Sequence, residues 1–156
     1  MANTRAVDLS VDDLDRAIIE QLQEDGRRTY TRIGHTVGLS EAAVRQRVQR
    51  LLDGNAMQVV AVTDPMALGF KRMGMIGVRT EGDVVKLAET LGSWPEVSYV
   101  VLTAGSFDLM VEVVVEDDSA LLELLNGKLR SLAGVRSTET FVYLRLYKQA
   151  FTWGVR

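Results

Sequence analysis

The sequence predicts an α+β chain with an N-terminal helix-turn-helix (winged-helix-like) domain and a C-terminal ferredoxin-like βαββαβ domain. Up to about residue 53, apolar residues recur every three or four positions, which is the period of amphipathic helices. Beyond that point, β-rich runs alternate with helical ones in the order of a split βαβ unit. We therefore expect a DNA-binding domain over residues 1–55, a strand-bearing connector over 56–70 and a second domain with a tail over 71–156.

Three helices are expected in the first domain, over residues 12–24, 31–37 and 40–53. Asp12 or Asp13 can cap the first helix, and Gly26 can end it in the left-handed conformation. Gly38 supplies a tight turn before the third helix, and the hydroxyl of Ser40 can accept one of that helix's free backbone N–H groups. Two short helices joined by such a turn are typical of a helix-turn-helix.

The second domain follows a β-rich connector segment at residues 57–65. Asp83 and Asp118 are suitable helix N-caps, and Gly92 and Gly134 are suitable helix stops. In chain order we expect a strand at 73–80, a helix at 83–91, strands at 97–103 and 107–115, a helix at 118–132 and a last strand at 135–146.

The composition excludes several classes of protein. The 156 residues include no cysteine, which removes disulfides, thiolate metal sites and a cysteine nucleophile. His35 is the single histidine, and no paired-carboxylate or metal-ligand spacing is present, so we expect no enzyme activity, no catalytic residue and no metal. No apolar run approaches the roughly 20 residues that span a membrane, and the N-terminus lacks the apolar core of a secretory signal. We expect a cytoplasmic protein with no membrane partner.

Charge is distributed unevenly along the chain. Residues 26–50 contain six arginines and one glutamate, a local charge of +5, whereas the whole chain carries −3, so the remainder carries −8. Because salt screens exposed charges beyond about 8–10 Å, this basic segment can bind a polyanion although the whole chain is acidic. The segment therefore predicts double-stranded DNA as a partner; the alternative is a three-helix bundle with a solvated basic surface.

Two kinds of DNA contact are expected from the helical domain. Residues near the start of the third helix can reach base edges in the major groove, where arginine reads guanine and glutamine reads adenine; these are Glu41, Ala42, Arg45 and Gln46. Phosphate contacts fix the register on the duplex without reading its sequence, and they suit Arg27, Arg28, Arg32, Arg47 and Arg50. Thr31 and Ser40 complete the predicted DNA-binding residues.

The segment LDRAIIEQLQEDGRRTYTRIGHTVGLSEAAVRQRVQRL, residues 14–51, resembles the N-terminal domain of the Lrp/AsnC, or feast/famine, family of prokaryotic transcription regulators. The turn AGSFD (104–108), the strand STETFVYL (137–144) and the tail LYKQAFTWG (146–154) resemble that family's ligand-sensing domain, so the resemblance covers essentially the whole chain. It implies effectors, mostly amino acids, bound at a dimer interface, and dimers that assemble further, often into octamers. The chain departs from the family at Leu52, where glutamate is usual, and at Asn55, where glycine is usual.

The last strand predicts a homodimer. Its alternate residues place Thr138 and Thr140 on one face and Phe141 and Tyr143 on the other, and both faces are largely apolar. Two helices cover one face of a four-stranded sheet, so the second face is expected to meet another copy of the chain. The family resemblance extends this expectation to a tetramer or octamer. Two aromatic residues are expected to be packing anchors: Trp94, and Trp153 in a tail that contacts another subunit.

The turn after the strand at 97–103 is the candidate effector site. Gly105 allows close backbone approach, turn N–H groups can receive a carboxylate, and Asp108 can pair with an α-ammonium group. The predicted effector-binding residues are Gly105, Ser106, Phe107, Asp108, Thr138 and Thr140. The alternative is a plain β-hairpin in which Asp108 caps the turn. Ser106 stands where the family often has aspartate.

These patterns predict a sequence-specific DNA-binding transcription regulator whose C-terminal domain oligomerises and binds a small effector such as an amino acid. No cofactor is expected apart from that effector. The alternative is an effector-independent architectural protein of the same fold that organises DNA by assembly.

Overall fold

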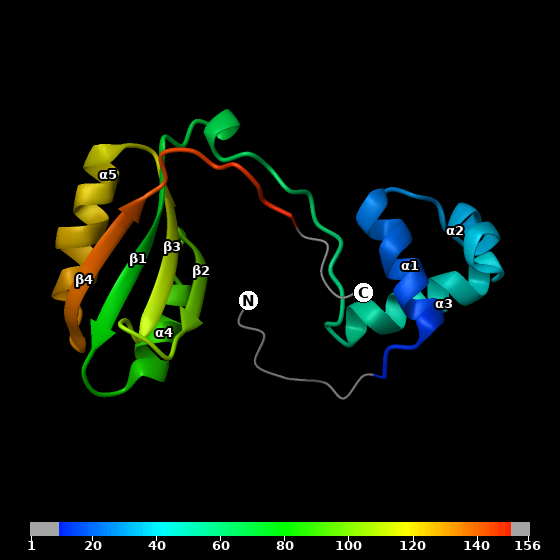
Figure 1. Ribbon diagram of the computed structural model, residues 1–156, viewed down its shortest axis with the longest axis horizontal. Coiled ribbons are helices and arrows are strands. Elements are labelled where there is room, and N and C mark those ends of the chain that lie inside the picture. Colours follow the sequence, from blue (N-terminus) through cyan, green and yellow to red (C-terminus); the bar gives the residue numbers. More distant parts are fainter. Residues whose placement is uncertain (1–9, 151–156) are drawn as a thin grey trace. The chain divides into compact units, whose positions relative to one another are not determined.

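Residues 10–150 are described by the computed structural model, and they form two compact units (Figure 1). The helical unit contains residues 10–62 and 148–150, and the sheet unit contains residues 63–147. The helical unit thus takes in the first part of the predicted connector and also residues near the end of the chain, which the sequence predicts to belong to the second domain. No helix within residues 10–150 is long and apolar enough to cross a membrane.

Three helices build the helical unit: α1 (Asp13–Glu24), α2 (Tyr30–Val37) and α3 (Glu41–Asp53). Each helix contributes one apolar stripe to a shared core, as the helical period predicts. The fully buried members of this core are Ile18, Ile33, Val44 and Val48.

The start of α1 is capped as predicted, but its end is not. The Asp12 carboxylate accepts a hydrogen bond from the Asp15 N–H at 2.8 Å, and the Asp15 carboxylate accepts one from the Asp12 N–H at 3.1 Å, which completes a capping box. Gly26 does not take the predicted left-handed conformation. The chain leaves the helix earlier, because Asp25 is already extended while its N–H still bonds the Gln21 carbonyl.

The connector does not form the strand predicted over residues 57–65. This segment is extended and pairs with no strand of the described chain. A strand is stabilised by pairing with a neighbouring strand, and β propensity alone does not form one. Val59, Val60 and Val62 are more than half exposed. The segment begins after Asn55, which is left-handed at φ 53°, and is followed by a short 3-10 turn, η1 (Met66–Leu68).

The sheet unit is a four-stranded antiparallel sheet with its strands in the order β2-β3-β1-β4. Its elements run β1 (Arg72–Thr80), α4 (Val84–Gly92), β2 (Val97–Leu102), β3 (Leu109–Val115), α5 (Asp118–Leu122) and β4 (Val135–Val142). This order is that of the predicted ferredoxin-like βαββαβ domain, so the α+β fold class is confirmed. Asp83 caps α4 as predicted, and Asp117 caps α5 in place of the expected Asp118.

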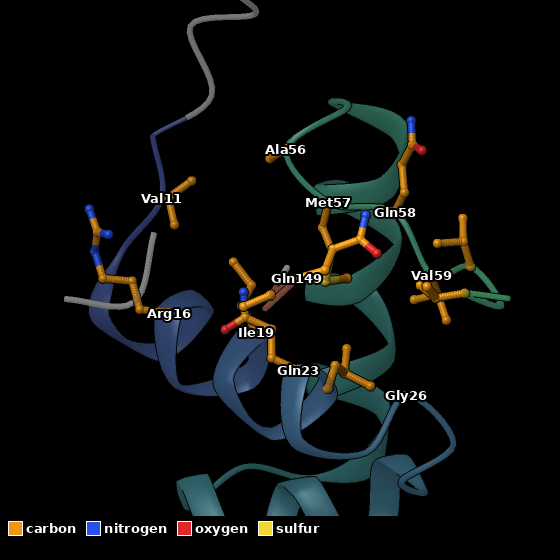
Figure 2. Close-up of a pocket in the computed structure, with 14 residues that line it drawn as sticks. Val11, Arg16, Ile19, Gln23, Gly26, Ala56, Met57, Gln58, Val59 and Gln149 are labelled. Carbon is orange, nitrogen blue, oxygen red and sulfur yellow. The ribbon is translucent and has the colours of Figure 1, made fainter. Parts of the chain in front are cut away.

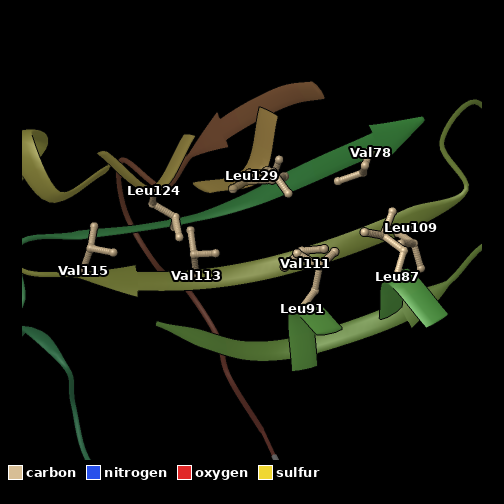
Figure 3. Packing of buried hydrophobic residues seen from close by; sticks show 10 residues of the cluster. Val78, Leu87, Leu91, Leu109, Val111, Val113, Val115, Leu124 and Leu129 are labelled. Carbon is tan, nitrogen blue, oxygen red and sulfur yellow. The ribbon is translucent and has the colours of Figure 1, made fainter. Parts of the chain in front are cut away.

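Both helical segments of the sheet unit cover the same face of the sheet, where they enclose the main core (Figure 3). Alternate residues of the two central strands point into this core between leucines of the helices. Its buried members are Ile76, Val78, Leu87, Leu91, Leu109, Val111, Val113, Val115, Leu124 and Leu129. Trp94 packs against the same cluster, as expected for a packing anchor, whereas Trp153 lies outside the described residues.

Three elements of the sheet unit are shorter than predicted by two residues or more. The helix expected at 118–132 continues beyond α5 as a π-helical turn, η2 (Glu123–Lys128), and a 3-10 turn, η3 (Leu129–Ser131). Gly127 falls in the π-helical turn, and glycine weakens a helix interior. β4 stops at Val142, opposite Gly74 near the start of β1, and β3 starts only at Leu109, opposite Leu102, the last residue of β2.

Candidate nucleic-acid interface

A compact turn of residues 38–40 joins α2 to α3. Gly38 is left-handed at φ 75°, and the Leu39 N–H donates to the Gly34 carbonyl at 2.9 Å. A side chain at Gly34 would collide with the Leu39 carbonyl oxygen, so the two helices approach as closely as the backbone allows. Ser40 caps α3, because its hydroxyl accepts a hydrogen bond from the Ala43 N–H at 3.2 Å. The predicted helix-turn-helix is therefore present.

The residues predicted to read bases lie together on the exposed side of α3. Glu41, Ala42, Arg45 and Gln46 are all exposed in the first turn and a half of the helix. Behind them, Val44 packs in the core and holds the helix to the unit. This is the placement that a recognition helix needs for its N-terminal side chains to enter a major groove. Their contacts with DNA stay a prediction.

Glu41 organises this surface. Its carboxylate accepts a hydrogen bond from the Thr31 hydroxyl at 2.7 Å and forms an ion pair with Arg45, also at 2.7 Å. The Arg45 guanidinium in turn lies over the Tyr30 ring, 5.3 Å from its centroid. The Thr31 hydrogen bond, and after it the Arg45 hydrogen bond, hold the pKa of Glu41 below its usual value, so Glu41 is charged at neutral pH. Tyr30 was not among the predicted site residues.

A second charge cluster fixes α3 to α1. Asp15 is fully buried, and its carboxylate bonds to both Arg47, at 2.8 Å, and Arg50. Arg47 also bonds Asp12 at 2.7 Å, which holds the pKa of Asp12 below its usual value. The predicted phosphate contacts of Arg47 and Arg50 stay a prediction, and the structure gives both side chains a role in positioning α3. The sequence carried a signal for this role: Asp12, the N-cap of α1, and Asp15 in its first turn are three residues apart, as are Arg47 and Arg50 on α3.

The remaining three arginines of the basic segment differ in their availability. Arg28 is half-buried, forms an ion pair with Glu24 at 2.9 Å and bonds the Gln21 amide oxygen. Arg27 and Arg32 are exposed and form no ion pair with any residue between 10 and 150. The structure therefore leaves Arg27 and Arg32 as the side chains with most freedom to meet a phosphate group.

The predicted effector turn of the sheet unit is held by hydrogen bonds from β1 and by one bond of its own. The Asp108 carboxylate accepts from the Thr80 N–H at 2.6 Å and from the Thr80 hydroxyl at 3.2 Å. The Arg79 side chain donates to the Ser106 carbonyl at 2.8 Å, and the Thr103 hydroxyl donates to the Phe107 carbonyl at 2.6 Å. Asp108 thus binds the end of β1, whereas the plain-hairpin alternative expects it to cap its own turn, and its role in effector binding stays a prediction.

The structure does not bring the two predicted threonines to this turn. Thr138 and Thr140 lie directly opposite Val78 and Ile76 across β4 and β1, on the face that the helices cover. Phe107 lies on the other face, where its ring fills the space above Gly77 and meets Phe141 edge-to-face at 6.2 Å. The β4 alternation was predicted correctly, but the sequence did not show which face the turn would join.

The uncovered face of the sheet is mostly apolar. Glu112 is a polar exception, and its carboxylate accepts hydrogen bonds from Ser98 at 2.8 Å and Tyr143 at 3.0 Å. Burial, and after it the neighbouring Glu112, raise the pKa of Tyr143 to about 12. The alternation of the strands places on this face Met73, Met75, Tyr99, Val101, Met110 and Phe141.

A helix-turn-helix with an exposed recognition helix, followed by a ferredoxin-like domain with an uncovered apolar sheet face, defines a DNA-binding regulator with a separate second domain. Comparison with protein families agrees with this class. Residues 11–52 match the AsnC-type helix-turn-helix domain, and residues 74–153 match the Lrp/AsnC ligand binding domain. The chain belongs to the Lrp/AsnC family of transcription regulators.

Individual relatives are transcription regulators and not enzymes. An uncharacterized HTH-type transcriptional regulator of Pyrococcus horikoshii is 34% identical over 97% of this chain and 94% of its own length. The proline dehydrogenase transcriptional activator of Rhizobium radiobacter is 31% identical over 96% of this chain and 98% of its own. Among solved structures, Escherichia coli AsnC has a TM-score of 0.82 at 24% identity, covering 92% of this chain and 99% of its own. A Neisseria meningitidis transcriptional regulator in complex with L-Met also has a TM-score of 0.82, at 23% identity, covering 94% of this chain and 97% of its own.

Proposed function

We propose that this transcription regulator recognises a specific DNA sequence through the start of α3. The observation that supports the proposal is the joint exposure of Arg45 and Gln46 beside the turn, with α3 held from behind by apolar packing and by the Asp15 cluster. Both side chains can make bidentate contacts to purines in the major groove. Glu41 accepts hydrogen bonds, as a reader of the cytosine amino group must, but it first has to exchange Thr31 or Arg45 for the base.

Binding to a selected duplex and to single-base variants of it tests this proposal. Arg45→Ala and Gln46→Ala should each reduce discrimination at one position by about 1–3 kcal/mol. Arg32→Ala should weaken binding to all the duplexes alike, because a phosphate contact carries no sequence information. Gln49→Ala, further along the exposed side of α3, is the matched control. Equal losses on every duplex for Arg45→Ala and Gln46→Ala would contradict a base-reading role.

We further infer that the sheet unit binds an amino acid or a related small molecule. The match to a ligand binding domain supports this inference, as does the complex of the Neisseria meningitidis regulator with L-Met. With Thr138 and Thr140 on the helix-covered face, the proposed site rests on residues 105–108, where the Arg79 guanidinium could receive a carboxylate. Thermal unfolding with each of the twenty amino acids tests this. A ligand at 100 times its Kd stabilises the folded chain by about 2.7 kcal/mol, whereas no response to any of them would favour the architectural alternative.

The uncovered sheet face supports a homodimer as the basic assembly. Tyr99 and Phe141 remain about half exposed on that face, at 53% and 43%. A second copy of the same face would cover them through a self-complementary contact. A dimer also suits a helix-turn-helix, since paired units reach half-sites about one helical turn apart.

A further inference from the structure

A groove in the helical unit has no role in the functions described so far. It has a volume of about 710 Å³ and lies between α1 and the extended segment that follows α3 (Figure 2). Its walls are mainly apolar, and Val59, Val60 and Val62 in its lining are 52%, 67% and 61% exposed. A cluster of exposed apolar residues of this kind marks a docking site for another apolar group.

The last residues that the structure describes line this groove. Gln149 and Ala150, which follow the sheet unit, line it together with Ile19 and Leu22 of α1. Figure 2 shows the Gln149 side chain in the middle of the groove, between Ile19 and the residues after α3.

The residues that follow Ala150 in the sequence include two large aromatic ones. The sequence continues Phe151, Thr152, Trp153, and if this stretch is extended, alternation would place Phe151 and Trp153 on the same side as Gln149. Each large aromatic side chain can bury about 150–250 Å². Two of them would cover the exposed valines, and a 710 Å³ groove lies within the range of sites that bury small ligands.

We propose that this groove is the docking site of the chain's own C-terminal residues 151–156, with Phe151 and Trp153 as anchors. The helical unit is then attached to the sheet unit twice, once through the connector after residue 62 and once through the docked end of the chain after β4. Because β4 leads directly into this segment, the docked end is a second path by which the sheet unit is linked to the DNA-binding unit.

The fluorescence of Trp153 tests this in the full-length chain. Trp94→Phe leaves Trp153 as the single tryptophan. Its emission should be shifted to short wavelength and protected from acrylamide, and adding Val59→Asp and Val62→Asp should shift the emission to longer wavelength and remove the protection. The paired control, Leu68→Asp and Val85→Asp, changes exposed apolar residues of the sheet unit and should change neither reading. Circular dichroism verifies that all variants remain folded.

Two results would overturn the proposal: a Trp153 that is exposed before the groove is altered, and a protected Trp153 that does not respond to the groove variants. The chain's lack of cysteine allows a second measurement that identifies whose tail is bound. Gln58→Cys with Thr152→Cys should give a disulfide-linked product of one chain on a non-reducing gel. A product of two chains would assign the groove to the tail of a second copy and contradict docking within the chain. Neither reading depends on DNA, so a failure here is distinguishable from a failure of the proposed function.

Discussion

Asp15 is buried in the helical unit and forms ion pairs with two arginines of α3, so one carboxylate links the recognition helix to α1 through two side chains. Replacing such a buried acceptor by a neutral residue is costly, because Arg50 then loses its charged partner and Arg47 keeps only Asp12. The same carboxylate also completes the cap of α1. One residue therefore couples the first helix of the unit to the third.

Asp15→Asn should destabilise the helical unit by about 2 kcal/mol. Asparagine keeps the size of the side chain and removes its charge, and the cost stays below the 3–5 kcal/mol of a fully buried pair because Arg47 and Arg50 reach solvent. Hydrogen exchange of the amides in α1 and α3 measures the loss. Asp13→Asn, an exposed acid in the same helical turn, should have little effect. Equal effects of the two substitutions would remove Asp15 from this role.

The pKa of Asp12 gives the helical unit an acid-sensitive contact. The Arg47 hydrogen bond holds this pKa below the ordinary 3.8. A carboxyl whose pKa is lowered by folding stabilises the folded state above its unfolded pKa, and the contribution disappears as the pH falls through the folded pKa. Protection of the α1 amides should therefore decrease from about pH 5 to about pH 2. Asp12→Asn should make the decrease smaller, and an unchanged pH profile in that variant would contradict the assignment.

The roles of individual residues were predicted well where their contacts are local in sequence and poorly where the contacts join distant segments. Asp12 and Ser40 as caps, and Gly38 as the turn residue, follow from rules that involve only neighbouring backbone groups. The buried ion pairs of Asp15 join helices more than thirty residues apart, so composition alone gave Arg47 and Arg50 only a phosphate role.

At the scale of elements, the α2–α3 turn depends on backbone contact. A Cβ at Gly34 would overlap the Leu39 carbonyl oxygen, which cannot move without displacing the start of α3. Gly34→Ala should therefore destabilise the helical unit by about 1–3 kcal/mol and weaken DNA binding. Thermal unfolding and duplex titration measure the two effects.

Gly92→Ala provides the control for that substitution. Gly92 is the last residue of α4, and a Cβ added there would meet no atom within 4 Å, so alanine should be neutral or slightly stabilising. A tolerated Gly34→Ala with full DNA binding would show that the close approach of α2 and α3 is not required.

The elements themselves were largely predictable, and the exceptions share a cause. The three N-terminal helices and the four strands of the sheet follow from amphipathic period and cap residues. The strand expected at 57–65 failed because pairing is a long-range property that β propensity does not report. The prediction that Thr138 and Thr140 join the effector turn failed for a similar reason. The turn's Phe107 packs over Gly77, on the sheet face opposite the two threonines, and this packing is a long-range contact.

At the scale of the whole molecule, the proposed homodimer would form through the uncovered sheet face. Tyr99→Asp places a charge on that face at an exposed position, so it should dissociate the proposed dimer without unfolding the chain. Val85→Asp, at an equally exposed position on α4, should leave the dimer intact. Light scattering gives the mass of each variant. A dimer that persists in Tyr99→Asp would place the interface elsewhere.

The distribution of charge accounts for DNA binding by an acidic protein. Ion pairs within the helical unit occupy Arg28, Arg45, Arg47 and Arg50, yet Arg27 and Arg32 remain exposed without an ion pair to the described residues. The acidic excess belongs to the rest of the chain, where screening limits its reach. Net charge therefore says little about the surface that meets DNA.

Titration of the full-length protein with a fluorescent DNA duplex over a range of salt concentrations tests the central claim most directly. The logarithm of the association constant should fall linearly with the logarithm of the salt concentration. Arg27→Ala should reduce the steepness of that line by about 1, whereas Arg136→Ala, at an exposed arginine of β4, should leave it unchanged. A protein that binds no duplex, or binds one independently of salt, would contradict the assignment of the helical unit as the DNA-binding surface.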